Sequence, residues 1–255
     1  MDDFHDIETV FYPILLRDTL EIIQADQKEN AADYFFTTSG LVVNGNAEDN
    51  LCIKAYQLLK KDFPYIPSIA MHLHKAISMG AGLGGGSADG TFTLLLLNQK
   101  FKLNLSEEQL LDYASKLGSD CPFFIINKPC YATGRGEILE PLALDLSAFT
   151  FVIVDPKVHI SSAWAFSQAT LTKAQMTIKE LILQPVETWR AHLKNDFEQP
   201  AFNKYPELKE VKERLYKDGA VYAAMTGSGS AIFGLFTTKQ PSLSSFPPNY
   251  GLTIL

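Results

Sequence analysis

The sequence predicts a protein of mixed helices and strands that divides into two domains. Its 255 residues are 46% hydrophobic and 20% charged, which supplies enough apolar material for a core and is close to ordinary globular usage. Strand-like and helix-like spacings of apolar residues follow one another without an internal repeat of fixed length. A composition change over residues 141–147 precedes an apolar strand at 149–154, so we expect domains at 1–145 and 146–255.

Local signals define elements in the first domain. Residues 41–43 predict a strand that enters a tight turn, and the acidic and capping residues at 48–50 predict a helix from Leu51. From Ile69 apolar residues alternate with histidines, which predicts a strand that runs into Gly80.

Further helices are expected on both sides of the boundary. Residues 87–97 carry apolar residues compatible with a helix, and the capping box at 106–109 starts another that stops at Gly118. An apolar strand is expected after Pro122. In the second domain residues 207–217 predict a helix.

Composition excludes several classes of protein. The formal charge of −7 gives no electrostatic drive toward nucleic acid or anionic membranes. The longest apolar run is far shorter than the ~20 residues of a membrane helix, and the acidic start opposes a signal peptide. Cys52, Cys121 and Cys130 form no C-x-x-C pair, so neither a disulfide framework nor a zinc cluster is indicated. We therefore expect a cytoplasmic protein with no metal site of its own.

A glycine-rich segment between strand and helix indicates an anion site. Five glycines fall within the seven positions 80–86. Glycine lets the backbone adopt positive φ and approach a ligand, and a helix that follows directs N–H groups and its dipole at the same point. A flexible turn is the structural alternative. Ser87 could add a hydroxyl to phosphate or metal.

Other glycine-loop motifs fit less well. A dinucleotide fingerprint matches formally, but about twenty residues later the chain has a helix cap instead of a strand end. No Gly-Lys dipeptide occurs, which excludes a P-loop of the Walker type, and the protein-kinase motifs are missing. A dinucleotide-dependent oxidoreductase remains an alternative, and tight NADH binding would favour it.

Two other segments could belong to the same site as this loop. The small-residue loop 226–230 lies between strand-like segments and could close over phosphates from the second domain. Asp120 places a carboxylate at a helix exit, where from position alone a turn or cap role is the better interpretation.

The order G-L-G-G-G-S, then G-S-D-x-P-F-F, then T-G-S-G-S resembles the GHMP kinase family, over essentially the whole chain. Residues 4–9, 157–161 and 195–198 support the resemblance. It implies a two-domain α+β fold, with an N-terminal ATP-binding domain and a ferredoxin-like C-terminal domain. Small departures are Ser78 for proline, Gly90 for alanine, and Asp3 for the glycine of D-G-Y-H.

The resemblance also implies an ATP- and magnesium-dependent kinase that phosphorylates a hydroxyl of a cytidyl diphosphate substrate. Asp120 would be the base. Phe4 and His5 would contact the cytosine, together with substrate-binding residues Thr226, Gly227 and Ser228. The residues expected to hold the ATP phosphates are Ser78, Met79, Gly80, Ala81, Gly82, Leu83, Gly84, Gly85, Gly86, Ser87 and Ala88.

One departure from the family is large. The family opens with a P-A-K-x-N-L segment whose lysine works with the aspartate, and this sequence starts after it. Weakened activity is therefore expected, or nucleotide binding without turnover. The loss would leave a sheet edge open to association, for example in a homodimer. A GHMP kinase of another small alcohol is a further alternative, which protection by cytidine nucleotides would exclude.

Overall fold

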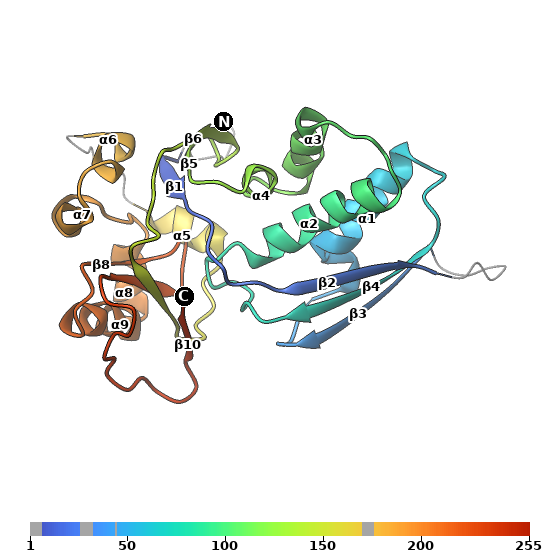
Figure 1. Cartoon of the computed structure of the whole chain (residues 1–255). Coiled ribbons are helices and arrows are strands. Elements are labelled where there is room, and N and C mark those ends of the chain that lie inside the picture. Colours follow the sequence, from blue (N-terminus) through green and yellow to red (C-terminus); the bar gives the residue numbers. More distant parts are fainter. Residues whose placement is uncertain (1–6, 26–32, 44, 170–175) are drawn as a thin grey trace.

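The computed structural model describes residues 7–25, 33–43, 45–169 and 176–255. The strands are β1 (Thr9–Phe11), β2 (Thr19–Gln24), β3 (Tyr34–Gly40), β4 (Ile69–Lys75), β5 (Cys130–Thr133), β6 (Ile138–Pro141), β7 (Thr150–Asp155), β8 (Tyr222–Met225), β9 (Ile232–Phe236) and β10 (Gly251–Ile254). The helices are η1 (Ala47–Asp49), α1 (Leu51–Asp62), α2 (Gly85–Lys100), α3 (Glu107–Leu117), α4 (Cys121–Ile126), α5 (Ser162–Gln168), α6 (Ile178–Ile182), α7 (Val186–His192), α8 (Glu198–Lys204) and α9 (Pro206–Lys217). Figure 1 shows two lobes, and the segment between β4 and α2 lies where they meet.

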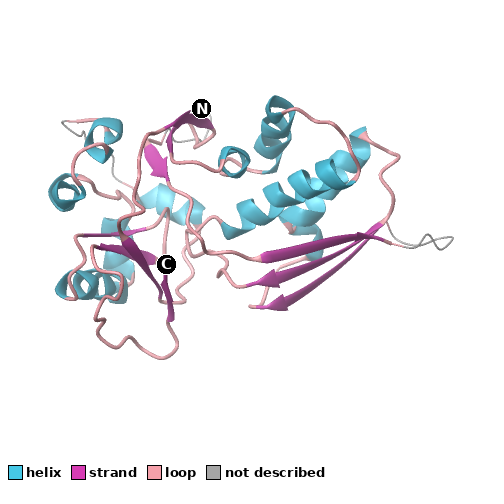
Figure 2. Cartoon of the chain, in the orientation of Figure 1, coloured by secondary structure: helices cyan, strands magenta, loops and turns pink. Residues whose placement is uncertain are grey.

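The N-terminal lobe is a helix layer on a three-stranded sheet. Strand β4 is central, antiparallel to β2 and parallel to β3, and α1 and α2 cover one face of the sheet (Figure 2). Ile69, Met71 and Leu73 alternate inward along β4 and are buried. The predicted alternating strand is therefore confirmed.

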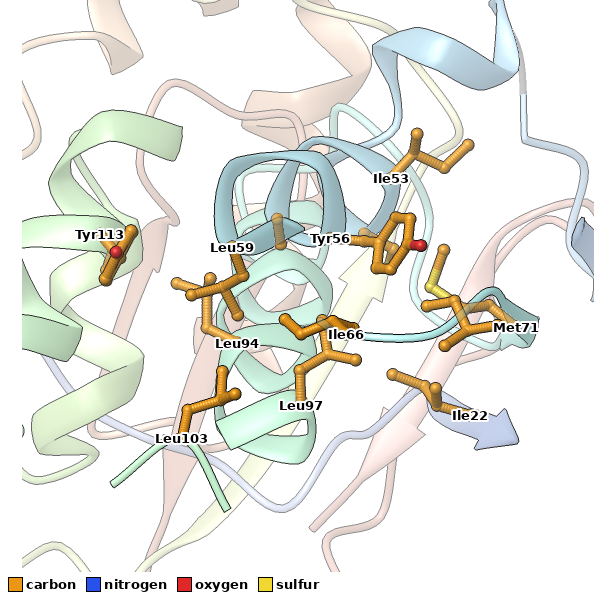
Figure 3. Close-up of a cluster of buried hydrophobic side chains, with 14 of the residues drawn as sticks. Ile22, Ile53, Tyr56, Leu59, Ile66, Met71, Leu94, Leu97, Leu103 and Tyr113 are labelled. Atoms are coloured by element: carbon orange, nitrogen blue, oxygen red, sulfur yellow. The ribbon is translucent and has the colours of Figure 1, made fainter. Parts of the chain in front are cut away.

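The core of this lobe forms between the sheet and its helices. Figure 3 shows Tyr56 and Leu59 of α1 beside Leu94 and Leu97 of α2, with Met71 of β4 to the right of Leu94 and Leu97. Tyr56 is almost fully buried and its hydroxyl donates to the carbonyl oxygen of Asp33 at 2.8 Å. This packing fixes α2 over the sheet and so fixes where its N-terminus lies.

The strand predicted at 41–43 is wrong in position. The strand is β3, which ends at Gly40, and the following residues are irregular. Gly40 has φ of +79° and a Cβ there would lie 2.2 Å from the carbonyl oxygen of Lys75. Leu41 then donates its N–H to that same oxygen, so the chain turns across the end of β4 instead of extending the sheet.

The segment after Asp120 is a helix where an apolar strand was expected. Helix α4 has Pro122 in its first turn, where a missing N–H costs no intrahelical hydrogen bond. Cys121, Pro122 and Phe123 are buried there. A short apolar run does not distinguish a buried strand from a buried helix, and packing against α2 and α3 decided the outcome.

The C-terminal lobe carries an antiparallel sheet in the order β10-β7-β9-β8. Numbered from β7, this order is 4-1-3-2, which is the ferredoxin-like arrangement that was expected. Helix α9 packs on β8 and β9. The connection from β9 to β10 contains no helix, although the ferredoxin-like pattern has one there.

A third small sheet, β1-β5-β6, lies between the lobes (Figure 1). Val10 and Tyr12 from the chain start pack in one cluster with Leu146 and Tyr222 from the second half. The boundary at 145/146 therefore stays a proposal, because a shared core crosses it.

Candidate active site

The glycine loop connects the end of β4 to the start of α2 at the junction of the lobes (Figure 1). Gly84 caps the helix in the left-handed conformation, and α2 continues for 16 residues. A helix of that length presents the N–H groups of its first turn, with their partial positive charge, at the loop. The predicted strand, loop and helix are thus in place.

Three glycines of the loop have positive φ for a structural reason. Gly80, Gly82 and Gly84 have φ of +70°, +73° and +69°. A Cβ at Gly82 would lie 2.1 Å from the carbonyl oxygen of Thr226, and one at Gly80 would lie 2.5 Å from a ring nitrogen of His159. The C-terminal lobe therefore packs directly against the loop backbone, which only glycine permits at these positions.

The carbonyl and N–H groups of the loop are used differently. The carbonyl oxygen of Gly82 accepts from the Thr226 hydroxyl at 2.9 Å, and that of Ala81 accepts from the N–H of Ala231 at 3.0 Å. Within the described residues, the N–H groups of Gly80, Gly82 and Gly84 donate to no acceptor. These two carbonyl oxygens are therefore held by the other lobe, while the three N–H groups stay available to bind an anion.

The second small-residue loop, 226–230, is tied on both sides. Its Thr226 holds the glycine loop, and the side-chain amide of Asn195 donates to the carbonyl oxygens of Met225 and Gly227, each at 2.8 Å. Ser228 lies 3.0 Å from the hydroxyl of Ser162. The structure therefore brings the predicted residues 226–228 to the glycine loop.

Asp120 lies immediately before α4 with its carboxylate exposed. It is the N-cap residue of α4, but its side chain accepts no capping hydrogen bond, and within the described chain its carboxylate has no hydrogen-bond or ion-pair partner. Surrounding protein atoms partly desolvate it, and this desolvation raises its pKa above the ordinary value. The next residue, Cys121, accepts a hydrogen bond at its carbonyl from Thr91 of α2 at 3.0 Å, and a Cβ at Gly84 would lie 3.0 Å from the ring of Phe124, so α4 packs against the N-terminal half of α2.

Phe4 and His5 fall outside the described residues, so their predicted contacts stay untested. Ile7 is the first described residue, and its N–H donates to the carbonyl oxygen of Gly134 at 2.7 Å. In the same turn, a Cβ at Gly136 would lie 3.4 Å from Ile7 and 3.6 Å from the carboxylate of Asp120. The segment that follows residues 1–6 therefore runs beside Asp120.

Sequence reasoning missed Lys157, which approaches the loop from the C-terminal lobe. Its ammonium donates to the hydroxyl of Ser78 at 2.5 Å and to the carboxylate of Asp155 at 2.8 Å. Burial alone would raise the pKa of Asp155, but the hydrogen bonds from Lys157 and Ser78 outweigh it and lower that pKa. Ser78 was predicted to hold the ATP phosphates and was noted as a departure from the family's proline, but its contact with Lys157 was not expected.

No preformed metal centre occurs in the part of the chain that the structure describes. No group of three or more His, Cys, Asp or Glu side chains there could hold an ion. The three cysteines are free and buried. His72 and His74 are each hydrogen-bonded to the hydroxyl of Ser39 on the sheet surface, at 2.9 Å. Among the described residues no helix has the length and apolar character to cross a bilayer.

The glycine loop ahead of a long helix has N–H groups without acceptors in the described chain, and Asp120 has no partner there either. This arrangement is suited to a phosphotransferase. Residues 50–128 match the GHMP kinases N terminal domain and residues 177–243 match the GHMP kinases C terminal domain. The chain belongs to the GHMP kinase family.

Curated relatives narrow the comparison. The chain is 48% identical over 240 residues to 4-diphosphocytidyl-2-C-methyl-D-erythritol kinase of Bacteroides fragilis, covering 94% of this chain and 86% of that protein. It is 44% identical over 239 residues to the protein of that name from Cytophaga hutchinsonii, covering 93% and 86%.

Solved structures agree with this family. A crystal structure of 4-(cytidine 5'-diphospho)-2C-methyl-D-erythritol kinase matches with a TM-score of 0.76 and 29% identity, over 92% of this chain and 82% of that one. Homoserine kinase from Cytophaga hutchinsonii matches with a TM-score of 0.64 and 18% identity, over 94% of this chain and 87% of that one, which shows the fold alone.

Proposed function

We propose that this chain is an ATP-dependent kinase that phosphorylates the 2-hydroxyl of 4-diphosphocytidyl-2-C-methyl-D-erythritol, in non-mevalonate isoprenoid precursor biosynthesis. The observation that carries the proposal is the glycine loop, in which the N–H groups of Gly80, Gly82 and Gly84 have no acceptor in the described chain while the carbonyl oxygens of Ala81 and Gly82 accept from the other lobe. The curated relatives with more than 40% identity over most of the chain supply the substrate.

ATP would bind with its phosphates on residues 78–88. The unpaired N–H groups of Gly80, Gly82 and Gly84 supply donors, and a Cβ at Gly86 would meet nothing within 4 Å, so the backbone there is open to a ligand. Magnesium keeps water and phosphate ligands and needs few protein ligands, so the Ser87 hydroxyl at the start of α2 fits one of its positions. When bound, the ion neutralises charge on the phosphates.

Asp120 would act as the general base. Its carboxylate accepts the proton of the substrate hydroxyl as the oxygen forms its bond to the γ-phosphorus, and the bond to the departing ADP breaks. A raised pKa makes this carboxylate a stronger base than an ordinary aspartate, which favours proton transfer. Its lack of a protein partner in the described chain leaves it free to face a substrate.

The substrate's cytidyl diphosphate part is assigned by similarity. Thr226, Gly227 and Ser228 border the glycine loop, and Phe4 with His5 would contact the cytosine. We expect the enzyme in the cytoplasm, and its assembly as a homodimer stays a prediction.

The test is ATP- and magnesium-dependent phosphorylation of 4-diphosphocytidyl-2-C-methyl-D-erythritol, with the product followed by phosphorus NMR. We expect turnover in the unmodified chain and a kcat reduced about 10²–10⁴-fold in Asp120→Asn. Melting temperatures measured with and without ATP should show that the variant still binds the nucleotide. Asp112→Asn, which removes an exposed carboxylate on α3, is the matched control and should keep its activity.

The pH dependence checks the base itself. Because the working form of Asp120 is ionised, activity should fall as the pH drops through its pKa, and that midpoint should lie above the ~3.9 of an ordinary aspartate. If Asp120→Asn were as active as the unmodified chain, Asp120 would not be the general base. Stabilisation by ATP and cytidine nucleotides without product would instead indicate a binding protein.

A further inference from the structure

A buried group of three charges lies directly beneath the glycine loop. The ammonium of Lys75 donates to the carboxylate of Asp18 and, at 2.7 Å, to that of Asp89. The three side chains are only 2%, 4% and 9% exposed, respectively. We call Asp18, Lys75 and Asp89 the buried triad.

The triad joins three elements at the two ends of the loop. Asp18 immediately precedes β2, Lys75 is the last residue of β4, and Asp89 lies one turn into α2. The loop leaves β4 after Lys75 and enters α2 at Gly85, so the ion pair between Lys75 and Asp89 sets the separation of its ends.

Asp18 also shapes the first residues of the loop. Its second carboxylate oxygen accepts the N–H groups of Ala76 at 2.6 Å and Ile77 at 2.9 Å. A Cβ at Gly85 would lie 3.0 Å from Ile77 and 3.5 Å from Asp18, so the helix start packs directly on this arrangement. Both ends of the loop therefore rest on one carboxylate.

Stability alone does not explain such a group. Taking charges out of water is costly, and a buried ion pair often contributes no more to stability than apolar residues of the same volume. With all three groups ionised the triad carries one excess negative charge. Burial raises the pKa of Asp89 to about 6 although Lys75 opposes this. The ionised form of Asp89 is therefore less favourable here than in water.

We propose that Asp18, Lys75 and Asp89 are positioning residues for nucleotide binding, which hold the ends of the glycine loop so that its free N–H groups converge on the ATP phosphates. The inference rests on the proposed function. The triad is too buried to touch a ligand, so it acts through the loop. A loop containing three glycines at positive φ would otherwise sample many conformations, and ordering it would reduce affinity.

The experiment compares Asp18→Asn and Asp89→Asn with the unmodified chain. Each variant removes one negative charge and leaves Lys75 one carboxylate partner. In Asp18→Asn the single amide oxygen cannot accept both from Lys75 and from the N–H groups of Ala76 and Ile77, so this variant should loosen the loop more than Asp89→Asn does. We expect KM for ATP and the Kd of ATP to rise about tenfold, while KM for the alcohol substrate changes less than twofold. Amide hydrogen exchange of residues 76–84 should accelerate in both variants without ligand.

Tyr113→Phe is the matched control. It removes a buried hydrogen bond of 2.7 Å to Asp62 in the same lobe, away from the loop. Its melting temperature should fall, with KM for ATP and exchange in the loop unchanged. A lower melting temperature with an unchanged KM for ATP would show that loss of stability alone does not weaken nucleotide binding.

The outcomes distinguish the two proposals. If the unmodified chain neither binds nor uses ATP, the proposed function is wrong, and exchange in the loop still decides the ordering role of the triad. If the chain uses ATP and both variants keep its KM and the loop's exchange rates, the positioning role is overturned. Equal rises in both KM values would also overturn it.

Discussion

The glycine loop and the loop 226–230 contact each other but differ in structure. The first, residues 78–88, precedes a long helix and keeps the N–H groups of three glycines without acceptors in the described chain. The second, residues 226–230, joins two antiparallel strands and is closed by hydrogen bonds from the N–H of Gly229 to Thr226 and from the N–H of Thr226 to Ala231. In the described chain the second loop also has N–H groups without acceptors, at Gly227, Ser228 and Ser230, but only the first loop is followed directly by a long helix whose dipole points at those donors.

The difference shows what glycine contributes in each place. In the first loop glycine allows positive φ and leaves backbone donors accessible. Glycine also lets the two backbones meet, since a Cβ at Gly82 would lie 2.1 Å from the carbonyl oxygen of Thr226 and one at Gly227 would lie 3.3 Å from the carbonyl oxygen of Gly82. We infer that the first loop binds and the second clamps it.

The largest effect should come from filling the contact between the loops. Gly82→Ala places a methyl group 2.1 Å from the Thr226 carbonyl oxygen at a φ of +73°, so the loops must separate. We expect a loss of about 3 kcal/mol in the free energy of unfolding, measured by urea denaturation, and loss of stabilisation by ATP.

Gly86→Ala is the control for this change. The added methyl meets no protein atom within 4 Å and lies in helix α2, so stability should rise by up to about 1 kcal/mol. Equal destabilisation by both substitutions would contradict a specific contact between the loops.

A smaller effect should follow from weakening the support of the second loop. Asn195→Asp keeps the oxygen that accepts from the N–H of Phe197 but replaces the amide donor to Met225 and Gly227 with a carboxylate oxygen. We expect a loss of about 2 kcal/mol, seen as a lower melting temperature. Asn203→Asp adds the same charge on the exposed side of α8 and should change little; a similar loss there would mean that charge alone is responsible.

The smallest effect is expected at the single side-chain bond between the loops. Thr226→Val keeps the shape of the side chain and removes the hydroxyl that donates to Gly82. Stability should fall by about 1 kcal/mol, and KM for ATP should rise a few-fold. An unchanged KM would show that backbone contacts alone hold the first loop.

Much of the local structure could be predicted because its causes are local. Ser106 and Gln109 form the predicted capping box, and the alternation along β4 matches its burial. The helix after Asp120 was missed, because a short apolar run carries no period that distinguishes a strand from a helix.

The buried triad was missed although one sign was present. Lys75 continues the inward register of Met71 and Leu73, so an alternating strand ends with a lysine at a core position. Its partners lie 57 and 14 residues away in sequence, and neither Asp18 nor Asp89 carries a local sign of burial.

The sequence by itself determined the glycine loop between a strand and a helix and the family, and it predicted which residues carry the chemistry. These follow from backbone freedom, helix caps and motif order, which are properties of neighbouring residues. Only the tertiary structure decided that the second loop clamps the first, that Asp120 lacks a partner in the described chain, and that three buried charges support the loop. Those features depend on packing between distant segments, which sets contact distances and desolvation that no local pattern encodes.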